Sequence, residues 1–164
     1  MNIEVTRINQ SIENEPADYI RNTNEDYLFK LNKIVDEIEK NCSEKPVILL
    51  SGPSGSGKTT TALMIEKLLD ERGHNTHTIS MDNYFCPLTQ TEKELLGLGK
   101  IDLESPDRID KPLLNEQIND LANGREINIP RYDFKTSDRV YSEKKLKINK
   151  GEIVIFERMY SLKP

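Results

Sequence analysis

The chain has 164 residues, which is long enough for one domain with a hydrophobic core but too short for two domains of ordinary size. Its formal net charge of −5 argues against a nucleic-acid-binding protein, which usually carries a basic stripe. No apolar run approaches the roughly 20 residues of a membrane-spanning helix, and the polar N-terminus is unlike a secretion signal. Cys42 and Cys86 suggest neither a disulfide framework nor a metal site. We therefore expect a cytoplasmic protein with reduced thiols that binds neither nucleic acid nor membrane.

Residues 1–45 predict an N-terminal extension with one helix. The first twenty residues have weak hydrophobic patterning, and we expect them to be poorly ordered. Thr23 followed by Asp26 is typical of a helix start, and an apolar stripe then continues at helical spacing to about Asn41. The residues of this stripe are Leu28, Leu31, Val35 and Ile38.

Residues 46–164 predict a single α/β domain. Strands are expected at 47–50, 76–81, 126–129, 139–148 and 153–156, and helices at 60–72 and 112–122. Because strands alternate with helices, the pattern favours a three-layer fold of the P-loop NTPase type with a mostly parallel sheet.

A glycine-rich loop follows the first predicted strand. Its sequence completes the pattern G-x-x-x-x-G-K-[ST], in which backbone N–H groups surround a phosphate, the lysine adds a cation and the hydroxyl binds Mg²⁺. The following helix would direct the positive end of its dipole at the same phosphate. The alternative is a glycine-rich turn that binds no nucleotide. The expected phosphate-binding residues are Gly52, Pro53, Ser54, Gly55, Ser56, Gly57, Lys58, Thr59 and Thr60.

Acidic residues follow two other predicted strands. Asp82 comes directly after strand 76–81, and Glu157 comes directly after strand 153–156. Because the ligand crevice of a parallel sheet lies beyond the carboxyl ends of its strands, both carboxylates can join Thr59 around Mg²⁺. Asp82 can equally accept the proton of an attacking hydroxyl, as an aspartate does in kinases. The alternative is that Asp82 only caps the next helix, where Asp is favoured.

Five sequence motifs then identify a family resemblance. They are Gly52-Pro-Ser-Gly-Ser-Gly-Lys-Thr59, Ser80-Met-Asp-Asn-Tyr-Phe85, Asp102-Leu-Glu-Ser-Pro-Asp-Arg-Ile-Asp110, Ile129-Pro-Arg-Tyr-Asp-Phe-Lys135 and Ile153-Val-Ile-Phe-Glu157. With these motifs in this order, residues 46–162 resemble the uridine kinase and phosphoribulokinase family, and most of all its bacterial uridine kinase-like branch.

The resemblance implies ATP-dependent phosphorylation of a sugar hydroxyl, typically the 5′-hydroxyl of a pyrimidine ribonucleoside. The implied partner is therefore a small-molecule nucleoside or sugar acceptor. The resemblance assigns Asp82 as the catalytic base and Thr59 and Glu157 to the magnesium shell. Lys58 is the cation that we expect to assist the transfer.

The same resemblance implies an acceptor site. Glu104 matches a residue that contacts ribose hydroxyls, and Tyr132 and Phe134 match aromatic residues near the base. The planar rings can stack on a nucleobase, although core filling on a short strand is the alternative. Arg139 is a further candidate that would face a phosphate, or else an ordinary surface arginine.

The chain departs from the family pattern at three places. Ser137 stands where familiar pyrimidine kinases have a histidine, so base recognition would lose a polar partner. Arg158 follows Glu157 where a glycine is usual, and its side chain would either crowd the crevice or swing outward. The chain ends at Pro164, before the arginine-rich lid of the family.

We therefore expect a nucleoside or sugar kinase of the uridine kinase-like type, or the N-terminal part of one. One alternative is a catalytically impaired nucleotide-binding module that acts by binding or assembly. Another is a P-loop hydrolase that couples nucleotide cleavage to a conformational change. The sequence decides neither between ATP and GTP nor whether the protein is a homo-oligomer.

Overall fold

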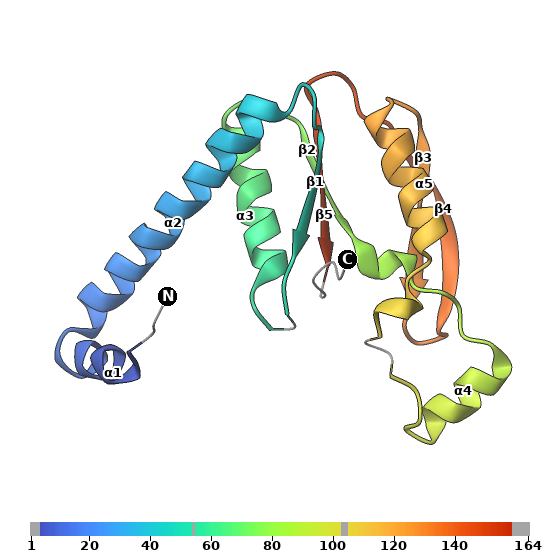
Figure 1. Cartoon of the computed structure of the whole chain (residues 1–164), viewed down its shortest axis with the longest axis horizontal. Helices are drawn as coiled ribbons and strands as arrows, with labels where there is room; N and C mark the ends of the chain where they lie inside the picture. The colour runs from blue at the N-terminus through green and yellow to red at the C-terminus, as the bar shows by residue number, and fades with distance from the viewer. Residues whose placement is uncertain (1–3, 54, 103–104, 159–164) are drawn as a thin grey trace. The chain divides into compact units, whose positions relative to one another are not determined.

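The computed structural model describes residues 4–53, 55–102 and 105–158 (Figure 1). The chain divides into two compact units, Met1–Ile38 and Glu39–Pro164. Of the predicted functional residues, Ser54 and Glu104 lie outside the described residues, as do residues 159–164 and the side chain of Arg158.

The first unit contains α1 (Val5–Asn14) and most of α2 (Pro16–Asn41). The expectation of a single helix is therefore wrong, because α1 lies in the region for which poor order was expected. Pro16 explains the break between the helices, because proline suits the first turn of a helix but disfavours a helical residue before it. Of the predicted stripe, three residues are buried and Leu28 is exposed. The overlooked signal in α1 is the helical spacing of Val5, Ile8 and Ile12.

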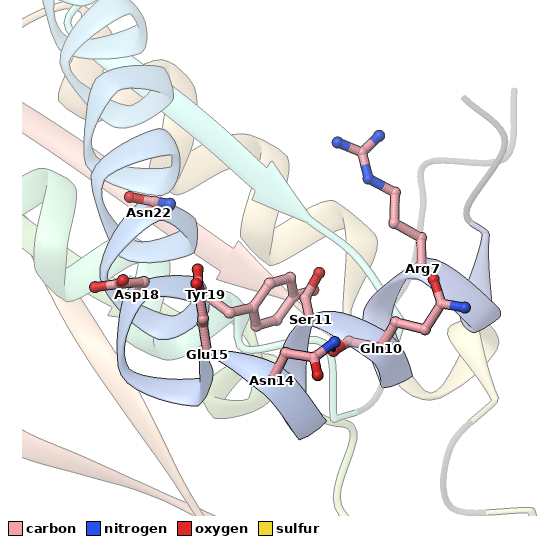
Figure 2. Close-up of a pocket in the computed structure, with 8 residues that line it drawn as sticks. All are labelled: Arg7, Gln10, Ser11, Asn14, Glu15, Asp18, Tyr19 and Asn22. Atoms are coloured by element: carbon pink, nitrogen blue, oxygen red, sulfur yellow. Dashed lines mark hydrogen bonds between the residues drawn. The ribbon is translucent and has the colours of Figure 1, made fainter.

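Residues of α1 and the first turns of α2 line an open hollow of about 520 Å³ (Figure 2). Figure 2 shows the ring of Tyr19, on α2, reaching towards Ser11 on α1. The hollow is polar and mixed in charge, and none of the phosphate-loop or acceptor residues that the structure describes lines it. The lining residues are Arg7, Gln10, Ser11, Asn14, Glu15, Asp18, Tyr19 and Asn22.

The second unit continues from the end of α2 with alternating strands and helices. In chain order these are β1 (Val47–Ser51), α3 (Lys58–Glu71), β2 (Thr76–Ser80), the 3₁₀ helix η1 (Met81–Tyr84), α4 (Gln90–Gly97), the 3₁₀ helix η2 (Pro106–Arg108), α5 (Lys111–Ala122), β3 (Ile127–Asp133), β4 (Asp138–Leu146) and β5 (Ile153–Arg158). No helix among the described residues is long and apolar enough to cross a bilayer.

A parallel sheet with the strand order β1-β5-β2 forms the centre of the second unit. The central strand β5 is fully buried from Ile153 to Phe156, as its unbroken apolar sequence predicts for a strand covered on both faces. Because both neighbours run parallel to β5, the carboxyl ends of all three strands lie at one edge. Glu157, near the end of β5, is in register with Leu50 on β1 and with Ser80 on β2.

Helices lie on both sides of this sheet. α3 contacts all three strands, and α5 lies on the other side in Figure 1. Val154 and Phe156 belong to the same core cluster as Leu114 and Leu121 of α5. Successive side chains of a strand point to opposite faces, so the other residues of β5 point towards the α3 layer. This layered α/β architecture with a parallel sheet confirms the predicted fold class.

The strands β3 and β4 form a separate antiparallel hairpin. The hairpin lies in the two predicted strand regions, but β3 runs on to Asp133, well past the expected end at Ile129, and β4 ends at Leu146, before the expected end at 148. The helix α4 was not expected from the sequence. Its signal is a capping box, in which the Thr89 hydroxyl accepts the Glu92 N–H and the Glu92 carboxylate accepts the Thr89 N–H.

A buried polar chain joins η1 to α5 and β3. The hydroxyl of Tyr84, which is fully buried, donates to Gln117 Oε1 at 2.8 Å. The amide of Gln117 in turn donates to the carbonyl oxygen of Asn128 at 2.9 Å. Burial raises the pKa of the Tyr84 hydroxyl, which therefore stays protonated as a donor. These two hydrogen bonds fix η1, the 3₁₀ helix that carries Asp82, against the core.

Tyr84→Phe should lower the free energy of unfolding by about 1–2 kcal/mol, because it leaves the buried Gln117 carbonyl oxygen without its donor. Urea denaturation measures this change. The matched control is Tyr19→Phe, which removes a half-buried hydroxyl on α2 and should change the stability by less than about 0.5 kcal/mol. Equal effects of the two substitutions would contradict a special role for the Tyr84–Gln117 bond.

Candidate active site

The glycine-rich loop joins β1 to α3 in a conformation that depends on its glycines. Gly55 and Gly57 have φ angles of 71° and 79°, in the left-handed region where a side chain is strained. At Gly52 the constraint is space instead. A Cβ atom there would lie 3.0 Å from Ser56 Oγ and 3.2 Å from Lys58 Cγ. Two different physical requirements therefore explain the glycines of the motif.

The N-terminus of α3 is suited to bind an anion. Gly57 is the N-cap residue, so no side chain caps the helix, and the first turn as described contains no acidic residue. The first N–H groups therefore have no side-chain acceptor at the positive end of the helix dipole. Lys58 Nζ donates to the carbonyl oxygen of Pro53 at 2.9 Å and so adds its charge at the loop. Backbone donors, dipole and lysine together fit a phosphate group.

Thr59 and Glu157 meet at the carboxyl edge of the sheet, although 98 positions separate them in the sequence. Thr59 Oγ1 donates to Glu157 Oε2 at 3.3 Å, and Glu157 is buried. By strand alternation Glu157 shares the face of β5 that points towards the α3 layer, and Thr59 lies in the first turn of α3.

A hydroxyl and a carboxylate are the hard oxygen ligands that Mg²⁺ prefers, so the Thr59–Glu157 pair fits this ion. Within the described ranges no three His, Cys, Asp or Glu side chains form a metal-binding group. An ion bound here would therefore need oxygens from substrate phosphates and water as well, which is the usual coordination of Mg²⁺ at nucleotide sites.

Asp82 lies in η1, directly beyond the carboxyl end of β2. Ser80, two residues earlier, is in register with Glu157, and β5 separates β2 from β1. Asp82 and the phosphate loop thus follow the two strands on either side of Glu157. The side-chain cap of η1 is Ser80, whose Oγ accepts the Asp82 N–H at 3.4 Å. The alternative from the sequence was that Asp82 caps the next helix. In the structure Ser80 is the N-cap residue of η1.

Three aromatic rings gather where η1 meets the hairpin. Phe85 follows η1, Tyr132 lies in β3, and Phe134 follows β3. The ring centroids of Tyr132 and Phe134 are 5.0 Å apart, and Phe85 lies 5.5 Å from Tyr132 and 5.8 Å from Phe134. Tyr132 is buried, as core filling requires, but Phe134 is 60% exposed. Core filling therefore does not account for Phe134, and its exposed ring is open to a ligand.

Arg139 of β4 ties the hairpin to η1. Its guanidinium donates to the carbonyl oxygens of Tyr84 at 3.3 Å and Phe85 at 2.9 Å, and to Asp110 Oδ2 at 2.9 Å. The side chain of Arg139 is only 9% exposed. From the sequence, Arg139 is expected either to face a phosphate or to lie on the surface. In the structure it makes these internal contacts and holds together the segments that carry the aromatic rings.

Asp110 connects the same cluster to α5. Its Oδ1 atom caps the helix by accepting the Leu113 N–H at 3.1 Å. Burial acts to raise the pKa of Asp110, but the Leu113 N–H and the Arg139 guanidinium outweigh burial and lower that pKa. Asp110 and Phe85 were both overlooked as site residues. The Asp-Lys-Pro start of α5 is a recognisable cap, whereas nothing in the sequence pairs Asp110 with Arg139.

Comparisons with known proteins identify the family of the chain. The family model described as "Phosphoribulokinase / Uridine kinase family" matches residues 47–163. The chain belongs to this family. The uridine kinase of Mycoplasma genitalium is 38% identical over 111 residues, which are 68% of this chain and 50% of that protein. The uridine kinase of Lactobacillus helveticus is 37% identical over 115 residues, which are 70% of this chain and 52% of that protein. The chain thus spans about half the length of these relatives.

A similar solved structure supports the fold. It is described as a "possible uridine kinase" from Bacillus stearothermophilus, and it superimposes with a TM-score of 0.55 at 19% identity. The match covers 79% of this chain and 71% of that one. At this level of identity the likeness concerns the fold alone.

Asp110→Asn should lower the free energy of unfolding by about 1–2 kcal/mol at neutral pH, because a neutral amide binds Arg139 more weakly. Asparagine can still cap α5, so the loss isolates the pair with Arg139. The pKa of Asp110 in the folded protein lies below its ordinary value of 3.8. The carboxylate therefore stabilises the fold above about pH 4, and this contribution disappears as the pH falls through the lowered pKa. Urea denaturation across this range should show the two proteins converging, and a constant difference would contradict the assignment.

Proposed function

We propose that this family member transfers the γ-phosphoryl group of ATP to a sugar hydroxyl of a nucleoside such as uridine or cytidine, or of a related small molecule. The observation that supports this proposal most strongly is the Thr59–Glu157 hydrogen bond of 3.3 Å. It lies beside the N-terminus of α3, which is suited to bind an anion. The relatives named uridine kinase support a nucleoside acceptor. The free thiols Cys42 and Cys86 are compatible with a cytoplasmic enzyme.

Residues Gly52–Thr60 would hold the triphosphate. The backbone N–H groups of the loop and of the first turn of α3 donate to phosphate oxygens, which requires the left-handed conformations of Gly55 and Gly57. Lys58 would exchange its bond with the Pro53 carbonyl for phosphate oxygens and offset the charge that moves during transfer.

Thr59, Glu157 and Asp82 would hold Mg²⁺, directly or through water. The ion, when bound, supplies positive charge that screens the phosphate oxygens against the incoming hydroxyl. The buried carboxylate of Glu157 would orient the Thr59 hydroxyl, whose hydrogen it already accepts. Because Glu157 is in register with Ser80 at the end of β2, its position is fixed by the sheet rather than by a loop.

Asp82 would act as the general base and accept the proton of the attacking sugar hydroxyl. η1 holds it rigidly, because Tyr84 is bonded to Gln117 and the carbonyl oxygens of η1 and Phe85 are bonded to Arg139. The rings of Tyr132 and Phe134 would stack on the base. Glu104 stays a prediction of the sequence resemblance for contact with the ribose hydroxyls.

The test is a coupled assay for ADP release from ATP·Mg²⁺, with and without a panel of nucleosides and pentoses. ADP release that depends on an acceptor would support the proposal and identify the acceptor class. ATP cleavage without any acceptor would favour a hydrolase, and ATP binding without turnover would favour a nucleotide-binding module.

Lys58→Ala should weaken ATP binding by about 10- to 100-fold while leaving the fold intact, because it removes a charged donor to the phosphates. Isothermal titration calorimetry measures the affinity, and circular dichroism checks the fold. The matched control is Lys67→Ala, which removes an exposed lysine from the same helix and should leave the affinity unchanged. Unchanged affinity in Lys58→Ala would refute the phosphate-loop assignment.

Asp82→Asn should reduce phosphoryl transfer by at least about 100-fold but change ATP affinity by less than about threefold, because general-base catalysis contributes to the transfer step. The measurement is the turnover rate with the acceptor found above, beside the ATP dissociation constant. Asp120→Asn on α5 serves as the control and should retain the wild-type rate. Near-normal transfer by Asp82→Asn would exclude Asp82 as the base.

A further inference from the structure

A pocket of about 270 Å³ lies at the amino edge of the parallel sheet, at the opposite end of the strands from the candidate active site. Its lining comes from three segments, which are residues 42–46 before β1, residues 121–124 at the end of α5, and residues 148–151 before β5. We call it the basal pocket. Its volume lies just below the roughly 300–1,000 Å³ of typical ligand pockets, so it fits a molecule smaller than a nucleotide.

Hydrogen bonds hold two walls of the basal pocket in place. The Pro46 carbonyl oxygen accepts the Val154 N–H at 2.8 Å, which ties the segment before β1 to β5. The Asn149 N–H donates to Glu152 Oε2 at 2.8 Å and so closes the loop before β5. The walls are therefore formed before a ligand binds, which lowers the entropy cost of binding.

Buried side chains form an apolar side of the basal pocket. Leu121 is fully buried, and Cys42 and Ile148 are buried as well. The Cys42 thiol already donates to the Glu39 carbonyl oxygen at 3.2 Å. These three side chains therefore present carbon and sulfur surface that suits an aliphatic group of a ligand.

Two opposite charges also line the basal pocket. Glu44 and Lys150 are both exposed, and within the part of the chain that the structure describes neither of them forms an ion pair. Glu44 lies just beyond α2, where its N–H donates to the Asn41 carbonyl oxygen at 3.0 Å, and the C-terminus of α5 lines the same pocket. Because helix C-termini carry the negative end of the helix dipole, Glu44 and these ends together favour an ammonium group. Lys150 favours a carboxylate.

A zwitterion satisfies both charges, whereas a ligand of one sign does not. A simple anion would be repelled by Glu44, and a simple cation would be repelled by Lys150. An ammonium group, a carboxylate and an aliphatic group on one small molecule are the features of an aliphatic α-amino acid.

We propose that the basal pocket binds a small aliphatic α-amino acid such as leucine. Its carboxylate pairs with Lys150, its ammonium group pairs with Glu44, and its side chain packs against the three buried residues of the apolar side. The site is independent of the proposed kinase function, because the phosphate loop and Glu157 lie at the other edge of the sheet. The lining segments lead directly into β1 and β5, so this placement suits an effector rather than a substrate.

The test is isothermal titration calorimetry of the full chain, without nucleotide, against four small molecules. Leucine has all three features, 4-methylpentanoate lacks the ammonium group, 3-methylbutylamine lacks the carboxylate, and glycine lacks the aliphatic side chain. The wild-type protein should bind leucine at least about tenfold more tightly than each of the others. Equal affinity for all four, or no binding of leucine, would overturn the proposal.

Two substitutions assign the charges separately. Lys150→Gln should bind leucine and 3-methylbutylamine within about twofold of each other, because the carboxylate no longer has its partner, but should still prefer leucine to 4-methylpentanoate. Glu44→Gln should show the reverse pattern. The matched control is Lys147→Gln, which removes an exposed lysine that does not line the pocket and should retain the wild-type preferences. Wild-type preferences in Lys150→Gln and Glu44→Gln would overturn the proposal.

Two further measurements keep the result unambiguous. Circular dichroism checks that the variants fold, and if one does not, the wild-type comparison of the four molecules decides alone. Leucine should also still bind when a non-hydrolysable ATP analogue saturates the protein, since the two sites lie at opposite edges of the sheet. Complete exclusion of leucine by the analogue would place it at the phosphate loop and overturn the proposal, whereas failure of the analogue to bind counts only against the proposed function.

Discussion

The parallel pairing of β5 with both β1 and β2 is the constraint on which the rest of the structure depends. It buries four apolar residues of β5 completely and brings Glu157 level with the ends of both neighbours. Since α3 starts at the end of the loop that follows β1, its Thr59 then lies within 3.3 Å of Glu157. The same register places η1, with Asp82, at this edge. Burial of the strand is therefore also what assembles the candidate magnesium and phosphate site.

A second set of contacts holds the acceptor side, and it depends on two arginines. Arg139 joins β4 to the carbonyl oxygens beside η1 and to Asp110, and Arg108 joins η2 to the Cys86 carbonyl oxygen and to Glu92 of α4. Both guanidiniums are largely buried and paired with a carboxylate, so they act locally as rigid connectors. They differ in one respect: of the two arginines, Arg108 alone has a buried donor, its Nε atom, without a partner among the described residues.

The sequence predicts structure well where local chemistry imposes it. The phosphate loop is recognisable because left-handed glycines, a lysine and a hydroxyl are needed at fixed spacing, and the unbroken apolar run of β5 predicts a buried strand. Prediction from the sequence failed where the local signal is short or interrupted. α1 is short and ends at Asn14, just before Pro16 starts α2, and α4 is marked only by the Thr89–Glu92 capping box. The hairpin could be predicted as two strands, but their antiparallel pairing apart from the main sheet could not.

By itself the sequence determined the layered α/β class and predicted the phosphate loop and the two carboxylates that follow strands, because each depends on residues close together in the chain. Only the tertiary structure decided that Thr59 contacts Glu157, that Ser80 caps η1, that Phe134 is exposed while Tyr132 is buried, and that Arg139 is bonded internally. The unpaired Nε of Arg108 is likewise invisible in the sequence. The physical reason is that hydrogen-bond partners, burial and exposure arise from contacts between distant segments, whose register is set by strand pairing and core packing.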